Sequence, residues 1–123
     1  MNTDREVARA WVRIQENWWA YDNIHDSVED RPRRAWRLLD ALTKVATTPM
    51  LVRDIGCGPL EDFVRLHAPA YIRQIERRCT ENSRFRRALI QAWLPRATDD
   101  VSVRLFALGI KPIGSKLEPW QAK

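Results

Sequence analysis

Residues 56–67, GCGPLEDFVRLH, determine how the middle of the chain must turn. Gly58 is acceptable as a helix N-cap, and Pro59 suits the first helical position because its missing N–H is not needed there. Glu61 and Asp62 fall in the first turn, where negative charge meets the positive end of the helix dipole. The stretch therefore predicts that one helix stops before this turn and that a second begins at Pro59.

The same stretch holds the side chains best suited to catalysis, but their spacing favours a structural role. Glu61 and Asp62 are adjacent, so on a helix they point about 100° apart and cannot act as a facing carboxylate pair. Glu61 is instead spaced for an i,i+4 ion pair with Arg65. His67 falls on the apolar face, which favours a core histidine bonded to a backbone carbonyl. A helix start lowers the pKa of a nearby thiol such as Cys57, but the sequence supplies no partner base. We assign a structural role to this set: Gly58, Pro59, Leu60, Glu61, Asp62 and His67.

The composition is that of a single globular domain. Of the 123 residues, 45% are hydrophobic and 30% are charged, which is enough to bury a core without disulfides or metal. We predict one helical domain over residues 1–109 and a C-terminal tail over 110–123. Cys57 and Cys79 do not form a CxxC pair, so we expect reduced thiols. We predict no catalytic residue, no metal ligand and no cofactor, and therefore not an enzyme.

The beginning of the chain shows no targeting signal. It is charged, unlike the apolar stretch of a signal peptide, and runs directly into an amphipathic pattern. No apolar run approaches the ~18 residues that a membrane-spanning helix requires. We therefore predict a cytoplasmic protein that does not bind a membrane.

The N-terminal segment predicts a long amphipathic helix followed by a loop. Thr3 and Glu6 form a capping box at the helix start. The apolar stripe that follows has helical spacing and consists of Val7, Trp11, Ile14, Trp18 and Tyr21. The acidic stretch 22–30 is poor in apolar residues and is expected to be a loop. His25 lies among its acids, but these donors are too few to predict a metal site.

The rest of the chain predicts further short helices. Apolar spacing and cap residues place them at 32–46, 48–56, 59–67, 69–79, 82–93 and 99–109. Pro69 is taken as a helix start, and Trp93 as an inward-facing residue. The alternation over 99–109 also permits a strand. The predicted fold is all-α, with six to seven short helices in antiparallel pairs that form a compact bundle or a minimal HEAT-like solenoid.

An ordered series of motifs from Trp36 to Trp93 resembles a known family. The series is Trp36-Arg37-Leu38-Leu39, Gly58-Pro59-Leu60-Glu61-Asp62-Phe63-Val64, His67, Ile75-Glu76 and Phe85-Arg86…Leu89…Trp93. It is similar to an uncharacterised bacterial family of small helical proteins, catalogued as a domain of unknown function, and the core signature spans 36–93. The chain departs from the family pattern at Gly56-Cys57, where small alanines are usual, and at Ala68, where a glycine often follows the histidine. The resemblance implies no activity.

The charge is divided unevenly along the chain. Residues 1–30 hold three basic and seven acidic side chains, whereas 31–98 hold fourteen basic and six acidic ones. A basic surface attracts an acidic partner. Six tryptophans and many arginines are typical of interface anchors. We therefore expect a protein that binds and neutralises or scaffolds another protein with an acidic surface, as immunity proteins and small inhibitors do.

We name candidate partner-binding residues from aromatic character and predicted outward position. They are Trp19, Arg33, Arg37, Arg73, Arg77, Arg86 and Arg87. The alternative is a nucleic-acid-binding protein, in which an arginine-rich face would contact phosphates. That face would combine Arg33, Arg34, Arg37, Arg73, Arg77, Arg78, Arg84, Arg86 and Arg87. Arginines gathered in one patch would favour nucleic acid. The sequence does not predict the oligomeric state.

Overall fold

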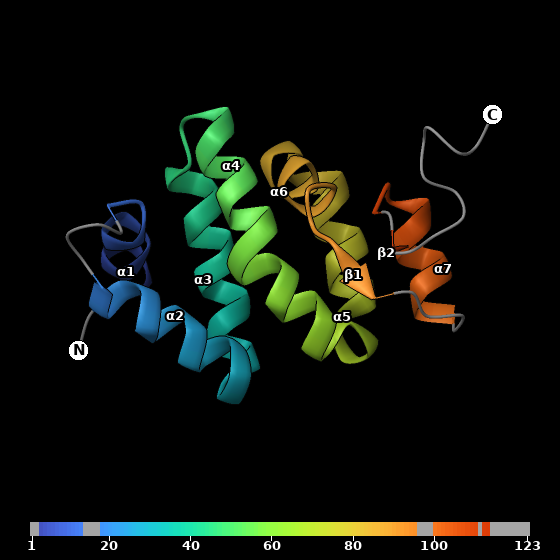
Figure 1. Ribbon diagram of the computed structural model, residues 1–123, viewed down its shortest axis with the longest axis horizontal. Coiled ribbons are helices and arrows are strands. Elements are labelled where there is room, and N and C mark those ends of the chain that lie inside the picture. The colour runs from blue at the N-terminus through green and yellow to red at the C-terminus, as the bar shows by residue number, and fades with distance from the viewer. Residues whose placement is uncertain (1–2, 14–17, 96–99, 111, 114–123) are drawn as a thin grey trace.

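Helices form most of the chain in the computed structural model, which describes residues 3–13, 18–95, 100–110 and 112–113 (Figure 1). The elements follow in this order: α1 (Asp4–Trp11), α2 (Trp18–Asp30), α3 (Pro32–Val45), α4 (Pro49–Ile55), the π-helical turn η1 (Gly56–Leu60), α5 (Glu61–Glu81), α6 (Ser83–Leu89), β1 (Leu94–Pro95), α7 (Asp100–Ala107) and β2 (Pro112–Ile113). The predicted all-α fold is confirmed. Within these ranges, the only strand pairing is the two-residue parallel contact of β1 with β2.

The first helix is shorter than the sequence predicts. Its cap forms as expected, because Thr3 Oγ1 accepts a hydrogen bond from the Glu6 N–H at 3.2 Å. The helix ends at Trp11 instead of continuing to Tyr21, and α2 begins at Trp18. Both helices pack against α3 and against each other. The prediction of one continuous helix is therefore wrong: Val7 and Trp11 belong to α1, Trp18 and Tyr21 belong to α2, and Ile14 lies outside the described residues.

The acidic segment 22–30 is helical, so the predicted loop is also wrong. Ala20, Ile24 and Val28 are buried and recur every four residues on one face of α2. The acids surround this narrow stripe and are mostly exposed. The stripe was missed because its two residues in this segment, Ile24 and Val28, scarcely change the polar composition of the segment.

The central turn forms, and it sets two helices close together. Gly58 has φ −116° and ψ −108°, values that interrupt the helical path between α4 and α5. Gly56 is buried, and a Cβ atom at this position would lie 1.9 Å from the Ala88 carbonyl oxygen. Glycine is therefore required at residue 56 for η1 to approach α6.

The predicted helix break at Pro69 does not occur. The helix α5 runs without interruption from Glu61 to Glu81 with Pro69 inside it. Pro69 lies on an exposed side of the helix. Water can there satisfy the carbonyl group that a proline leaves without a helical hydrogen bond. Two predicted helices are thus one.

The last helix, over Asp100–Ala107, confirms the helical interpretation of this segment over the alternative strand, and residue 99 lies outside the described residues. Gly109 has φ +103° and follows the end of α7. Its N–H bonds the Phe106 carbonyl at 3.0 Å, and the Ile110 N–H bonds the Leu105 carbonyl at 3.3 Å. These two bonds form a Schellman motif, in which glycine supplies the left-handed residue. Ile110 is buried, and the boundary between domain and tail stays a prediction.

The helices assemble into a compact bundle, one of the two predicted arrangements. The helices α1, α2 and α3 pack together at one end, and α7 packs on α5 at the other (Figure 1). The long helix α5 also contacts α2, α3 and α6, while α4 lies beside α6. Large side chains such as Leu39, Phe63 and Phe85 fill the core between them. No helix in the described ranges is long and apolar enough to span a membrane.

Candidate partner-binding site

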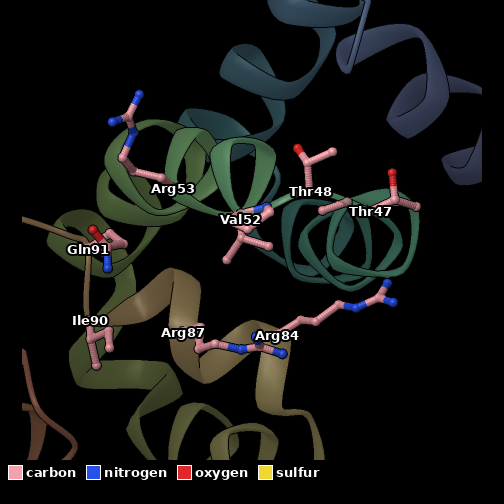
Figure 2. A pocket seen from close by; sticks show the side chains of 10 residues that line it. Thr47, Thr48, Val52, Arg53, Arg84, Arg87, Ile90 and Gln91 are labelled. Atoms are coloured by element: carbon pink, nitrogen blue, oxygen red, sulfur yellow. The ribbon is translucent and has the colours of Figure 1, made fainter.

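A pocket of about 540 Å³ lies between α4, α6 and the connection from α3 to α4 (Figure 2). Its walls combine cationic, hydroxyl, amide and apolar groups. The lining residues are Ala46, Thr47, Thr48, Pro49, Val52, Arg53, Arg84, Arg87, Ile90 and Gln91. None of these lining residues is acidic. The pocket therefore offers several hydrogen-bond donors and a local positive charge to any group that enters it.

Two helix caps position the walls of the pocket. Thr48 Oγ1 accepts from the Leu51 N–H at 3.2 Å, which starts α4 as the sequence predicts. Asn82 Oδ1 accepts from the Phe85 N–H at 3.1 Å and starts α6, also as predicted. The Asn82 side chain in addition donates to Thr43 Oγ1 at 3.2 Å, which fixes the start of α6 beside the end of α3.

The three arginines of the pocket come from two helices. Arg84 and Arg87 are three residues apart on α6 and therefore lie on the same side of it. Arg53 lies on α4, across the pocket from α6 (Figure 2). Its Nε is 4.0 Å from Asp54 Oδ1, the outer limit of an ion pair. In Figure 2 the Arg53 side chain points away from Arg84 and Arg87, so Arg84 and Arg87 are the two cations that lie together on one wall.

Arg84 contributes to the fold as well as to the pocket. Its Nη1 donates to the carbonyl oxygens of Thr43 at 3.3 Å and Lys44 at 3.2 Å. These are among the last carbonyls of α3, which a nearby cation stabilises. Arg84 therefore ties α6 to the C-terminal end of α3.

The predicted arginines lie on three helices, α3, α5 and α6. Of the predicted candidates, Arg87 lines the pocket, whereas Arg33, Arg73, Arg77 and Arg86 are exposed elsewhere. Candidate Arg37 forms an ion pair with Asp4 at 3.3 Å, so it joins α3 to α1. The side chain of candidate Trp19 lies outside the described residues.

Arg78 belongs to the interior and not to an arginine-rich face. Its guanidinium carbon lies 3.6 Å from the centroid of the Trp36 ring. Its Nη1 donates to the Trp36 carbonyl at 3.0 Å. Stacking on an aromatic ring together with a hydrogen bond is characteristic of a structural arginine. The predicted nucleic-acid set therefore includes at least one residue with a packing role.

The central motif makes structural contacts. His67 Nε2 lies 2.6 Å from the Val28 carbonyl oxygen, as the sequence predicts for a core histidine. Glu61 Oε1 accepts from the Trp93 N–H at 2.6 Å. Asp62, rather than Glu61, pairs with Arg65 at 2.8 Å, so the predicted Glu61–Arg65 pair is wrong. His67 thus joins α5 to α2, and Glu61 joins α5 to the segment after α6. Asp62 joins the first turn of α5 to the next turn of the same helix.

Burial raises the pKa of both thiols. Burial, followed by the charge of Glu61, raises the pKa of Cys57, although its side chain is exposed. Burial raises the pKa of Cys79 to about 11. The lowered pKa expected for Cys57 is therefore wrong, because Arg53 opposes these effects only in part.

The described residues contain no group of three potential metal ligands, and His25 pairs with Glu29 at 3.2 Å.

Two features of the surface were not predicted. Trp93 was expected to point inward, but it is 61% exposed, because α6 ends at Leu89 and the chain leaves the helix before Trp93. Arg53 was not singled out, because helical spacing alone does not show which helix faces α4. Its pocket neighbours Thr48 and Pro49 were identified only as a helix start.

Comparison with protein families gives one match. The chain matches the model of a family of unknown function, DUF6869, over residues 9–113. Searches of curated proteins and of solved structures found no significant match. The resemblance to an uncharacterised family of unknown function is confirmed. The bacterial origin and the motif series quoted for that family stay predictions.

Proposed function

We propose that this chain, which belongs to the family of unknown function DUF6869, is a non-enzymatic module that binds an acidic surface of another protein. The observation that supports the proposal is the pocket between α4 and α6, which three arginines and no acidic residue line. Such a pocket attracts carboxylates by charge and can hold them by charge-assisted hydrogen bonds.

Several arginines already bond other groups of the chain, which favours a protein partner over nucleic acid. An extended nucleic acid is bound by many cations along one face. Here Arg37 pairs with Asp4, and Arg104 pairs with Glu76. A pocket of about 540 Å³ suits a short acidic segment better than an extended phosphate backbone. Neutralisation or scaffolding of that partner in the cytoplasm is part of the proposal.

Binding of poly-L-glutamate and of single-stranded RNA, measured by fluorescence anisotropy at matched salt, tests the proposal. Wild type is compared with the Arg53→Gln/Arg87→Gln double variant and with an Arg33→Gln/Arg77→Gln control. The control removes the same charge from exposed positions outside the pocket. We expect the pocket variant to lose at least about tenfold in affinity for polyglutamate, because two of the three arginines that line the pocket are removed. Equal losses of polyglutamate affinity in the pocket variant and the control would contradict the proposal. So would RNA that binds more tightly than polyglutamate and that both variants weaken to the same extent.

A further inference from the structure

The pocket has an apolar part beside its cationic part, and the two are contributed by the same two helices. Val52 precedes Arg53 on α4, and Ile90 follows Arg87 after one turn of α6 (Figure 2). Ile90 is 42% exposed, and Val52 is only partly buried. Water in contact with such side chains is released at a gain in free energy when another apolar group covers them.

The cations of the pocket differ in how fully the fold already uses them. The Nη1 of Arg84 bonds two carbonyl oxygens of α3. Arg87 donates from Nε to the Ser83 carbonyl at 3.4 Å, a bond that does not involve its two terminal nitrogens. Since a guanidinium has five N–H donors, Arg87 retains donors for a ligand. Among the described residues, Arg53 has a long contact of 4.0 Å to its neighbour Asp54. Arg87 is therefore the arginine of α6 best placed to bind an incoming anion, whereas the Arg53 side chain points away from it (Figure 2).

We propose that the pocket recognises a short protein segment in which carboxylates flank an apolar side chain. Arg87, with Arg84 on the same side of α6, holds a carboxylate, and the apolar side chain covers Val52 and Ile90. This inference rests on the proposed function and adds the chemistry of the partner. A nucleic acid or free phosphate would satisfy the arginines and leave the apolar part uncovered, so the protein segment fits both parts of the pocket.

The test measures the affinity of three labelled pentapeptides for the full chain by fluorescence anisotropy. The peptides are Asp-Glu-Leu-Glu-Asp, its serine counterpart Asp-Glu-Ser-Glu-Asp, and the basic peptide Lys-Lys-Leu-Lys-Lys. We expect the leucine peptide to bind about tenfold tighter than the serine peptide, because it alone covers the apolar part. The basic peptide should not bind.

Two kinds of variant separate the contributions of charge and apolar contact. Ile90→Ser, or Val52→Ser if the first variant unfolds, should remove the preference for leucine and leave the serine peptide unaffected. Arg87→Gln should weaken both acidic peptides by the same factor. Circular dichroism establishes that each variant is folded before its affinity is compared.

The possible failures are distinguishable. If both acidic peptides bind equally and Arg53→Gln/Arg87→Gln weakens them, apolar recognition is overturned while the proposed function stands. If neither acidic peptide binds but RNA or inorganic phosphate does, both proposals are overturned. If the leucine preference persists in both apolar variants, the apolar contact lies elsewhere and the inference is overturned.

Discussion

Single side chains in this molecule illustrate what local patterns can and cannot predict. His67 was expected to bond a backbone carbonyl, and its Nε2 lies 2.6 Å from the Val28 oxygen. The prediction succeeded because a polar side chain on an apolar face needs a buried partner. Arg78 was assigned to the surface by its spacing, yet its guanidinium stacks on Trp36. The long arginine stem can reach a distant ring, and periodicity does not encode that reach.

Gly56 gives a stability prediction at the same scale. In Gly56→Ala the new methyl group would overlap the Ala88 carbonyl oxygen, which is backbone and cannot rotate away. We expect a loss of about 1–3 kcal/mol in the free energy of unfolding, as for other overpacked sites. Urea denaturation measures this loss.

Gly58→Ala is the comparison variant, because no atom lies within 4 Å of a Cβ at that position. It should cost less stability than Gly56→Ala. A Gly56→Ala protein as stable as wild type would show that η1 and α6 are not as close as described.

At the scale of elements, side-chain caps were more informative than Pro69, which was taken as a helix start. The caps at Thr3, Thr48 and Asn82 all form where the sequence placed them. The expected break at Pro69 did not form, because an exposed proline can be accommodated within a helix that packing stabilises on its other side. The helix α2 was missed because its buried stripe is narrow and its acids dominate the composition.

The contact between α5 and α7 gives a pH prediction. Arg104 Nε donates to Glu76 Oε2 at 3.0 Å, and this hydrogen bond lowers the pKa of Glu76 from its usual 4.5. A carboxyl group whose pKa is lower in the folded state stabilises the fold above its unfolded pKa, and this contribution disappears as the pH falls through the folded pKa. At neutral pH the melting temperature of wild type should therefore be higher than that of the Arg104→Gln variant. This difference in melting temperature should vanish on acidification.

Thermal unfolding followed over a pH series checks this expectation. Arg77→Gln is the control, because it removes an exposed arginine from α5 that is not among the groups shifting the pKa of Glu76. A difference between wild type and Arg104→Gln that stays constant down to pH values below the lowered pKa would contradict the account.

At the scale of the whole molecule, the fold class followed from the sequence and the site did not. Helical periodicity shows which residues share a face of one helix, and this was sufficient for an all-α bundle. The pocket combines residues 46–53 with residues 84–91. This juxtaposition depends on Gly56, which lets η1 approach α6, and on Asn82, which fixes α6 beside α3. Only Arg87 among the predicted partner-binding residues lines the pocket.

The central claim is that the pocket binds an acidic protein partner, and a pull-down from nuclease-treated native lysate tests it most directly. Wild type, Arg53→Glu/Arg87→Glu and a charge-matched Arg33→Glu/Arg77→Glu control serve as baits. We predict that wild type and the control retain one stoichiometric protein and that the pocket variant does not. This protein should elute as the salt concentration rises, because salt screens the charges that bind it. Two results would contradict the account. In the first, the baits recover nucleic acid from lysate without nuclease treatment and recover no protein from treated lysate. In the second, all three baits retain the partner equally.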